Sequence, residues 1–165
     1  MRRIRFSVLT VASTVLLGAF SMTALSQDLL TQKVLSLDLA QTIAQAAVVR
    51  CRADGYKVSV NILDAGGAVK VFIRDDGAGL GTNDISRRKA YTAVIFKRTS
   101  AEMGKNFAAT TPPPTFDGTI FLAGGVPIKA GEEVIGAIGV SGAPGGDKDE
   151  ACANAALAKV ADKLK

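Results

Sequence analysis

The stretch from Val58 to Arg74, VSVNILDAGGAVKVFIR, decides the fold of this chain. Apolar residues occupy every second position over 58–62 and again over 69–73, which is the period of a β-strand. The DAGG segment at 64–67 is short and glycine-rich, as hairpin connections are. The stretch therefore predicts two antiparallel strands joined by a tight turn.

A helix is predicted on each side of this hairpin. Upstream, Ser36 is suited to cap a helix over residues 37–53, because apolar residues recur there at helical spacing. Downstream, the glycine-rich segment 75–83 predicts a loop, and a second helix is expected over 84–98. Thr99 and Glu102 stand in capping-box register, so a short third helix is expected after it.

The C-terminal half predicts three more strands and a last helix. The expected strands are 119–122, 126–129 and 133–141. Gly136 and Gly139 weaken the last of these strands and so predict the close approach of a helix or of a ligand, with helix packing favoured. Asp147 and Glu150 stand in capping-box register at the start of the final helix.

The expected element order is α-β-β-α-β-β-β-α, with strand connections short enough for antiparallel pairing. This order predicts an α+β fold, a single five-stranded antiparallel sheet flanked by helices. The chain has 165 residues, of which 48% are hydrophobic, and this suits one compact domain.

The N-terminal segment 1–26 is predicted to be a signal peptide. It has a basic start, an apolar run over 6–20 and small residues before an expected cleavage site at Gln27. A permanent membrane anchor is the alternative, but the run is about 15 residues long where a span needs about 20. We therefore expect a periplasmic or secreted bacterial domain, residues 27–165, without permanent membrane insertion after cleavage.

Export changes the interpretation of the two cysteines. In an oxidising compartment Cys51 and Cys152 are expected to form a disulfide. The bridge would close a loop of about 100 residues and stabilise the fold by roughly 4 to 5 kcal/mol. The alternative is that both are small buried thiols.

Composition excludes several function classes. The chain has no histidine, which rules out a histidine base, a Ser-His-Asp triad and a His-rich metal site. Its formal charge is +5, but three of its 20 basic residues lie in 1–26, where no acid does. The remaining 17 basic and 15 acidic residues give a net charge of +2, so nucleic acid is not expected as a partner.

A basic run on the second expected helix is a candidate binding surface. Arg87, Arg88 and Lys89 are consecutive, and Arg74 ends the preceding strand. Converging cations of this kind bind carboxylates of small ligands through charge-assisted hydrogen bonds. The alternative is a solvated helix face.

Five strings resemble the GlcG/HbpS family, in order, across nearly all of residues 27–165. They are VSVNILDAGG (58–67), RDDGA (74–78), RKAYTA (88–93), GGVPI (124–128) and GAIGVSGA (136–143). This family is similar to the C-terminal domain of Pdu-type cobalamin adenosyltransferases. The resemblance implies heme binding, in some members heme degradation, a five-stranded antiparallel sheet and homo-oligomers that are often octamers.

The resemblance also implies which residues lie near a ligand. The motif positions expected there are Arg74, Asp76, Lys89, Thr92, Gly124 and Gly125. Because no histidine is present, an iron ligand would be Tyr91 or Met103 by chemical preference, with Lys89, Thr110, Thr111 and Thr115 as further candidates. Each has a structural alternative: a core aromatic, a gap-filling methionine, a loop cap or a tight turn.

Three functions follow as hypotheses. The first is an exported, oligomeric binder of heme or a related small molecule, with Arg74 and Lys89 pairing with its carboxylates. The second is an enzyme acting on heme or another small organic substrate, with Asp76 and Lys89 transferring protons. The third is a scaffold or sensor partner without ligand chemistry. The lack of a dedicated nucleophile or metal set favours binding over catalysis.

Overall fold

The computed structural model describes residues 29–110 and 114–165, so the expected signal peptide and Thr111 lie outside the described residues. The elements in chain order are α1 (Leu37–Ala53), β1 (Ser59–Asp64), β2 (Val69–Arg74), α2 (Thr82–Phe96), α3 (Ser100–Phe107), β3 (Gly125–Ala130), β4 (Glu133–Ser141), α4 (Gly146–Lys159) and a 3-10 turn (Ala161–Lys163). No helix in these two ranges is both long enough and apolar enough to cross a membrane.

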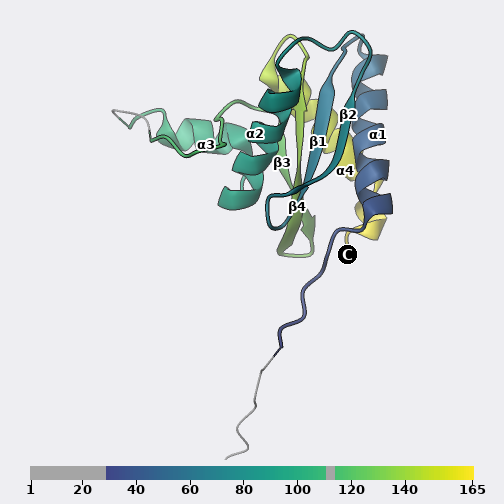
Figure 1. Cartoon of the computed structure of the whole chain (residues 1–165), viewed down its shortest axis with the longest axis vertical. Helices are drawn as coiled ribbons and strands as arrows, with labels where there is room; N and C mark the ends of the chain where they lie inside the picture. Colours follow the sequence, from purple (N-terminus) through teal and green to yellow (C-terminus); the bar gives the residue numbers. More distant parts are fainter. Residues whose placement is uncertain (1–28, 111–113) are drawn as a thin grey trace, which may run out of the picture. The chain divides into compact units, whose positions relative to one another are not determined.

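The domain over 32–165 has three layers. Its sheet has the strand order β2-β1-β4-β3, and every neighbouring pair is antiparallel. Helices α1 and α4 cover one face of the sheet and α2 covers the other (Figure 1). The α+β class predicted from the sequence is therefore confirmed.

Strand β1 shows how the sequence separates the two faces. Val60 and Ile62 belong to the large apolar core with α1 and α4. Their neighbours Ser59 and Asn61 point to the opposite face, because side chains alternate along a strand. There, the Ser59 hydroxyl lies 2.8 Å from that of Thr82, and the Asn61 amide donates to the Ser86 hydroxyl of α2 at 2.8 Å.

Gly139 brings α2 close to the sheet, as the sequence predicts. A Cβ at this position would overlap the Ser86 carbonyl oxygen and lie 3.0 Å from the Ala90 methyl carbon. The absence of a side chain at Gly139 is thus what allows the backbone of α2 to contact β4.

The predicted strand at 119–122 is wrong, and the sheet within the described residues has four strands rather than five. The backbone of this segment hydrogen-bonds to side chains instead of to a neighbouring strand. Arg88 donates to the Thr119 carbonyl from two nitrogens at 3.1 and 2.7 Å. The Ser100 hydroxyl donates to the Leu122 carbonyl, and Thr92 binds the backbone of Ile120.

Of the three helix N-caps predicted from the sequence, two are present in the structure. Ser36 caps α1, and Thr99 forms the expected reciprocal capping box with Glu102 at α3. The capping box predicted at Asp147 and Glu150 is wrong, because α4 already begins at Gly146 after an N-cap glycine without a side-chain cap. Helix α2 begins at Thr82 and ends at Phe96, two residues earlier at each end than expected.

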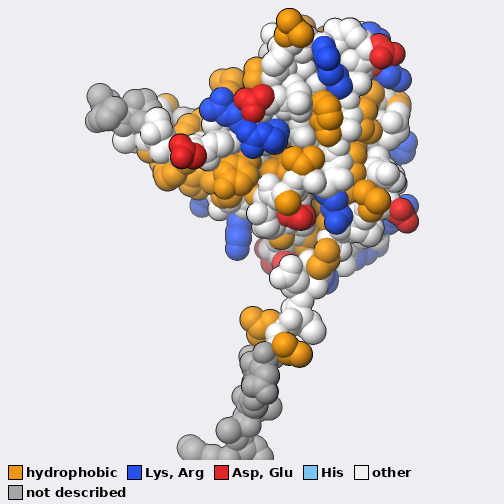
Figure 2. All heavy atoms as spheres, viewed as in Figure 1, with side chains coloured by type: hydrophobic (Ala, Val, Ile, Leu, Met, Phe, Trp, Pro, Cys, Tyr) orange, Lys and Arg blue, Asp and Glu red, His pale blue; other side chains and the backbone are white. Residues whose placement is uncertain are grey.

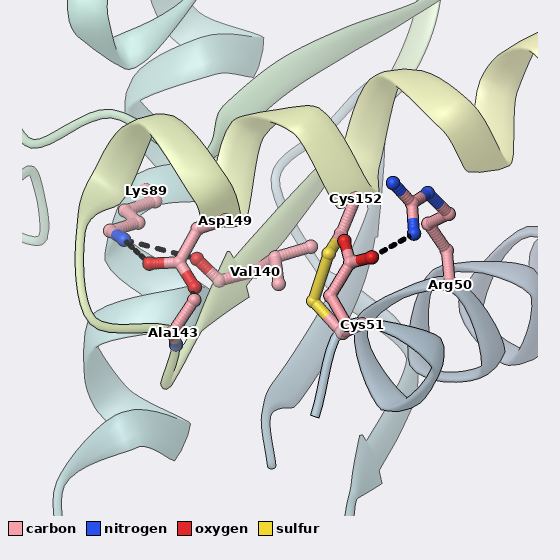
Figure 3. Close-up of a disulfide and its surroundings, with 8 residues drawn as sticks. Arg50, Cys51, Lys89, Val140, Ala143, Asp149 and Cys152 are labelled. Atoms are coloured by element: carbon pink, nitrogen blue, oxygen red, sulfur yellow. Dashed lines mark hydrogen bonds and ion pairs between the residues drawn. A yellow bond between two sulfur atoms is a disulfide. The ribbon is translucent and has the colours of Figure 1, made fainter. Parts of the chain in front are cut away.

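The predicted disulfide is confirmed. Cys51 near the end of α1 is bonded to Cys152 in α4, with 5.6 Å between their Cα atoms (Figure 3). Both side chains are buried in the core between the helices and the sheet. The bridge therefore fixes α1 against α4 on one face of the sheet.

Candidate functional site

A buried ion pair joins α2 to α4. The Lys89 ammonium lies 2.7 Å from Asp149 Oδ2, and the side chains are 3% and 4% exposed. Lys89 also donates to the Val140 carbonyl at 3.1 Å, while the Ala143 N–H donates to Asp149 Oδ1 at 2.9 Å (Figure 3). The pair thus links α2, the end of β4 and the first turn of α4.

Burial dominates the ionisation of Asp149. Loss of hydration raises the pKa of this carboxyl, and the hydrogen bonds and positive charge from Lys89 and the backbone offset only part of that effect. A perturbed carboxyl beside a charge partner in a cleft marks a candidate functional site. The arrangement can position a proton donor next to an acceptor.

Gly124 and Gly125 lie directly against Lys89. A Cβ on Gly124, where φ is 119°, would lie 2.9 Å from the Lys89 ammonium, and a Cβ on Gly125 would overlap the Lys89 carbonyl oxygen. The fold therefore brings together three residues that the sequence singles out. Thr92, one turn further along α2, binds the backbone of Ile120 instead.

A cavity of about 440 Å³ opens above the ion pair. We call it the Lys89 pocket; it is lined by Thr82, Ile85, Lys89, Leu122, Ala123, Ser141, Gly142, Ala143, Gly146, Asp147 and Asp149. Its volume lies within the range typical of small-molecule sites, about 300 to 1,000 Å³.

Arg74 and Asp76 do not line this pocket. The Arg74 guanidinium donates to the Ala78 carbonyl at 2.7 Å, which closes the loop after β2, and Asp76 is exposed in that loop. The neighbouring Asp75 is the buried acid: Arg52 donates to both of its oxygens at 2.9 and 2.6 Å. These hydrogen bonds lower the pKa of Asp75.

Tyr91 and Met103 lie on different helices, α2 and α3. The Tyr91 ring is half-buried between two turns, and a Cβ on Gly118 would lie 3.4 Å from it. Met103 is buried in α3, where its sulfur is 4.0 Å from the Asn106 amide nitrogen. Neither residue lines the Lys89 pocket.

A second cleft, which no sequence pattern predicts, lies beside α3. Four of the seven phenylalanines, at positions 96, 107, 116 and 121, form a cluster in which every pair of ring centres is within 6.4 Å. Hydrophobic side chains are visible at the base of α3 in Figure 2. A cleft of about 300 Å³ borders the cluster; we call it the aromatic groove, and it is lined by Arg88, Pro114, Thr115, Phe116, Thr119, Ile120 and Phe121.

One segment, residues 120–123, separates the two cavities. Ile120 and Phe121 line the aromatic groove, and the next two residues, Leu122 and Ala123, line the Lys89 pocket. The Thr92 hydroxyl accepts a hydrogen bond from the Ile120 N–H at 2.9 Å and so fixes this segment. Arg88 and Lys89, adjacent on α2, therefore serve different cavities.

Comparison with known proteins gives the family. The family model "Haem degrading protein HbpS-like" matches residues 35–158. The chain is 33% identical over 117 residues to Protein GlcG of Escherichia coli K12, covering 67% of this chain and 84% of that protein.

Solved structures agree with this match. The crystal structure of HbpS has a TM-score of 0.77 and 39% identity, covering 81% of this chain and 94% of that one. A PduOC:heme complex has a TM-score of 0.68 and 26% identity, covering 76% and 94%. With the family model matching most of the chain and the fold shared, this protein belongs to the HbpS-like family.

Proposed function

We propose that this protein binds heme, or a closely related tetrapyrrole, in the aromatic groove. Two comparisons support a heme ligand: the name of the family, and the structural similarity to PduOC, which was solved as a heme complex. The location rests on the residues that line the groove.

Heme binding requires an apolar surface for the macrocycle and a cation for its carboxylates. Phe116 and Phe121 supply aromatic surface in the groove, with Ile120 and Pro114 beside them. Aromatic rings bury large apolar areas and stack in offset or edge-on geometry. The chemistry of the lining residues fits the group.

The partners of the Arg88 guanidinium are the observation that carries the location. Its Nε and Nη2 donate to the Thr119 carbonyl, a neutral acceptor, and its Nη1 lies 3.8 Å from the exposed carboxylate of Asp84. An exposed ion pair of this length is weak. Lys89 is instead bound by a buried carboxylate, so Arg88 is the better partner for a propionate.

Thr115 is our first candidate for an iron ligand, because among the described residues that line the groove it is the one expected as a ligand from the sequence. Bound heme would supply an iron centre with positions open to an oxygen donor. Tyr91 and Met103 stay candidates from the sequence, and hemin titration of variants at these positions tests them.

Hemin titration of the purified protein, followed by its absorption spectrum, tests the proposal. We expect a saturable shift of the Soret band at one hemin per chain. The Thr115→Val variant should change the spectrum of the complex, while Tyr91→Phe and Met103→Leu should leave it unchanged. A titration without saturation would contradict heme binding.

Heme degradation is the second candidate, and the family description favours it. Among the described residues that line the groove, Arg88 is the one ionisable side chain. The groove thus offers no acid–base pair, which supports binding over catalysis. Loss of the Soret band with reductant and oxygen, together with a linear tetrapyrrole product, would instead establish the enzyme.

We also propose that the protein is exported and forms a homo-oligomer. The basic start and apolar run of residues 1–26 support export, and the disulfide suits an oxidising compartment. N-terminal sequencing of the periplasmic or secreted protein tests export; we expect it to begin at Gln27.

Native mass spectrometry tests the oligomer, which a purely monomeric mass would contradict.

A further inference from the structure

The Lys89 pocket is a second cavity that the heme proposal does not use. Of the residues that line the Lys89 pocket, none also lines the aromatic groove within the described part of the chain. It is the larger of the two, about 440 Å³ against about 300 Å³. A ligand of the Lys89 pocket would therefore bind independently of heme in the aromatic groove.

The charges of the pocket do not cancel. Lys89 and Asp149 neutralise one another in the buried pair, which leaves the exposed carboxylate of Asp147 as the remaining ionisable side chain among the described lining residues. The N-terminus of α4 adds about half a positive elementary charge nearby. One full negative charge outweighs it, so the pocket favours a cation over an anion.

The rest of the wall is largely apolar. Ile85, Leu122 and Ala143 line the cavity, and Leu122 is 53% exposed, so its side chain is available at the surface. The hydroxyl of Thr82 is already hydrogen-bonded to Ser59 and to the Gly79 carbonyl. An alkyl chain would replace water along this wall and gain the hydrophobic contribution of each buried methylene.

We propose that the Lys89 pocket binds a small organic cation: a primary alkylammonium whose chain packs on Ile85, Leu122 and Ala143 and whose head group pairs with Asp147. The buried pair forms the floor of the site and contributes no net charge. A carboxylate ligand of the same length is rejected, because Asp147 repels it and Lys89 is already engaged.

Three probes of equal chain length test the class of ligand: n-butylammonium, 1-butanol and butyrate. Amide chemical shifts of the whole protein report where each binds. We expect saturable shifts at Gly142, Ala143 and Gly146 with n-butylammonium, weaker ones with 1-butanol and none with butyrate. Shifts of equal or greater size with butyrate, or no saturable shift with n-butylammonium, would overturn the proposal.

Two variants test the residues. Asp147→Asn should weaken n-butylammonium binding about fivefold, the upper range for an exposed ion pair, while the exposed Asp162→Asn control should bind like the parent. Ala143→Leu should fill the cavity and abolish the shifts. Equal affinity of Asp147→Asn and Asp162→Asn would remove Asp147 as the cation partner. Hemin binding by Asp147→Asn should be unchanged, which separates this site from the aromatic groove.

Discussion

Lys89 and Asp149 lie 60 positions apart in the sequence, yet their side chains form an ion pair 2.7 Å long in the interior of the domain. The pair connects the helix on one face of the sheet to the helix on the other, past the end of β4. Two charges removed from water in this way are held by their mutual contact and by backbone hydrogen bonds.

Removing one member of this pair should destabilise the fold strongly. We expect Lys89→Met or Asp149→Leu to lower the free energy of unfolding by about 3 to 5 kcal/mol, because each leaves a buried charge without a partner. The double variant should lose much less than the sum of the two. Urea unfolding measures all three, with the exposed Asp84→Ala as control; additive losses would show that the pair is not coupled.

Thr92 should stabilise the segment that separates the two cavities. Thr92→Val keeps the shape of the side chain but leaves the Ile120 N–H without its hydroxyl acceptor. We expect a loss of about 1 kcal/mol in the free energy of unfolding, the lower end of the penalty for an unsatisfied donor, because this N–H is only partly buried. Thr42→Val on the exposed surface of α1 is the matched control. Equal stabilities of the two variants would contradict this role of Thr92.

The disulfide should contribute a large share of the stability. It joins residues separated by 101 positions. In the chain-entropy model, replacing both cysteines by alanine lowers the free energy of unfolding by about 4 to 5 kcal/mol. Denaturant unfolding of the two proteins measures the difference, and thiol alkylation without reductant confirms the bond in the parent. A loss below about 1 kcal/mol would contradict the prediction.

Acid should weaken the fold through Asp75. Arg52 lowers the pKa of this carboxyl below its ordinary value of 3.8, so the unfolded chain binds more protons than the folded one. Stability from this contact is therefore present above that ordinary value and is lost as the pH falls through the lower, folded-state pKa. Unfolding measured from about pH 5 to about pH 2 should show a smaller loss in Asp75→Asn than in the parent, and an unchanged slope would contradict this.

Much of the architecture follows from local sequence patterns. The alternation in VSVNILDAGGAVKVFIR is a property of neighbouring residues, so the hairpin and its turn could be predicted. The same holds for the caps at Ser36 and Thr99. The segment 119–122 has strand-like composition, but whether it pairs depends on side chains from α2 and α3 that no local pattern reports.

The site is less predictable because its partners come from distant positions. Lys89, Gly124 and Gly125 could be singled out from the sequence, but the role of Asp149 was missed. One signal was present: Asp149 precedes Cys152 by three residues, so a helix that buries the cysteine also turns this acid inward. The phenylalanine cluster had no comparable signal, since its four members are spread over 96–121.

Heme binding in the aromatic groove is tested most directly by comparing two adjacent arginines. Hemin affinity of Arg88→Gln should fall about tenfold or more, the effect of losing one charge-assisted hydrogen bond. Arg87→Gln, which removes the same charge from the same helix outside the groove, should bind like the parent. Equal affinities of the two variants and the parent would contradict heme binding in the aromatic groove.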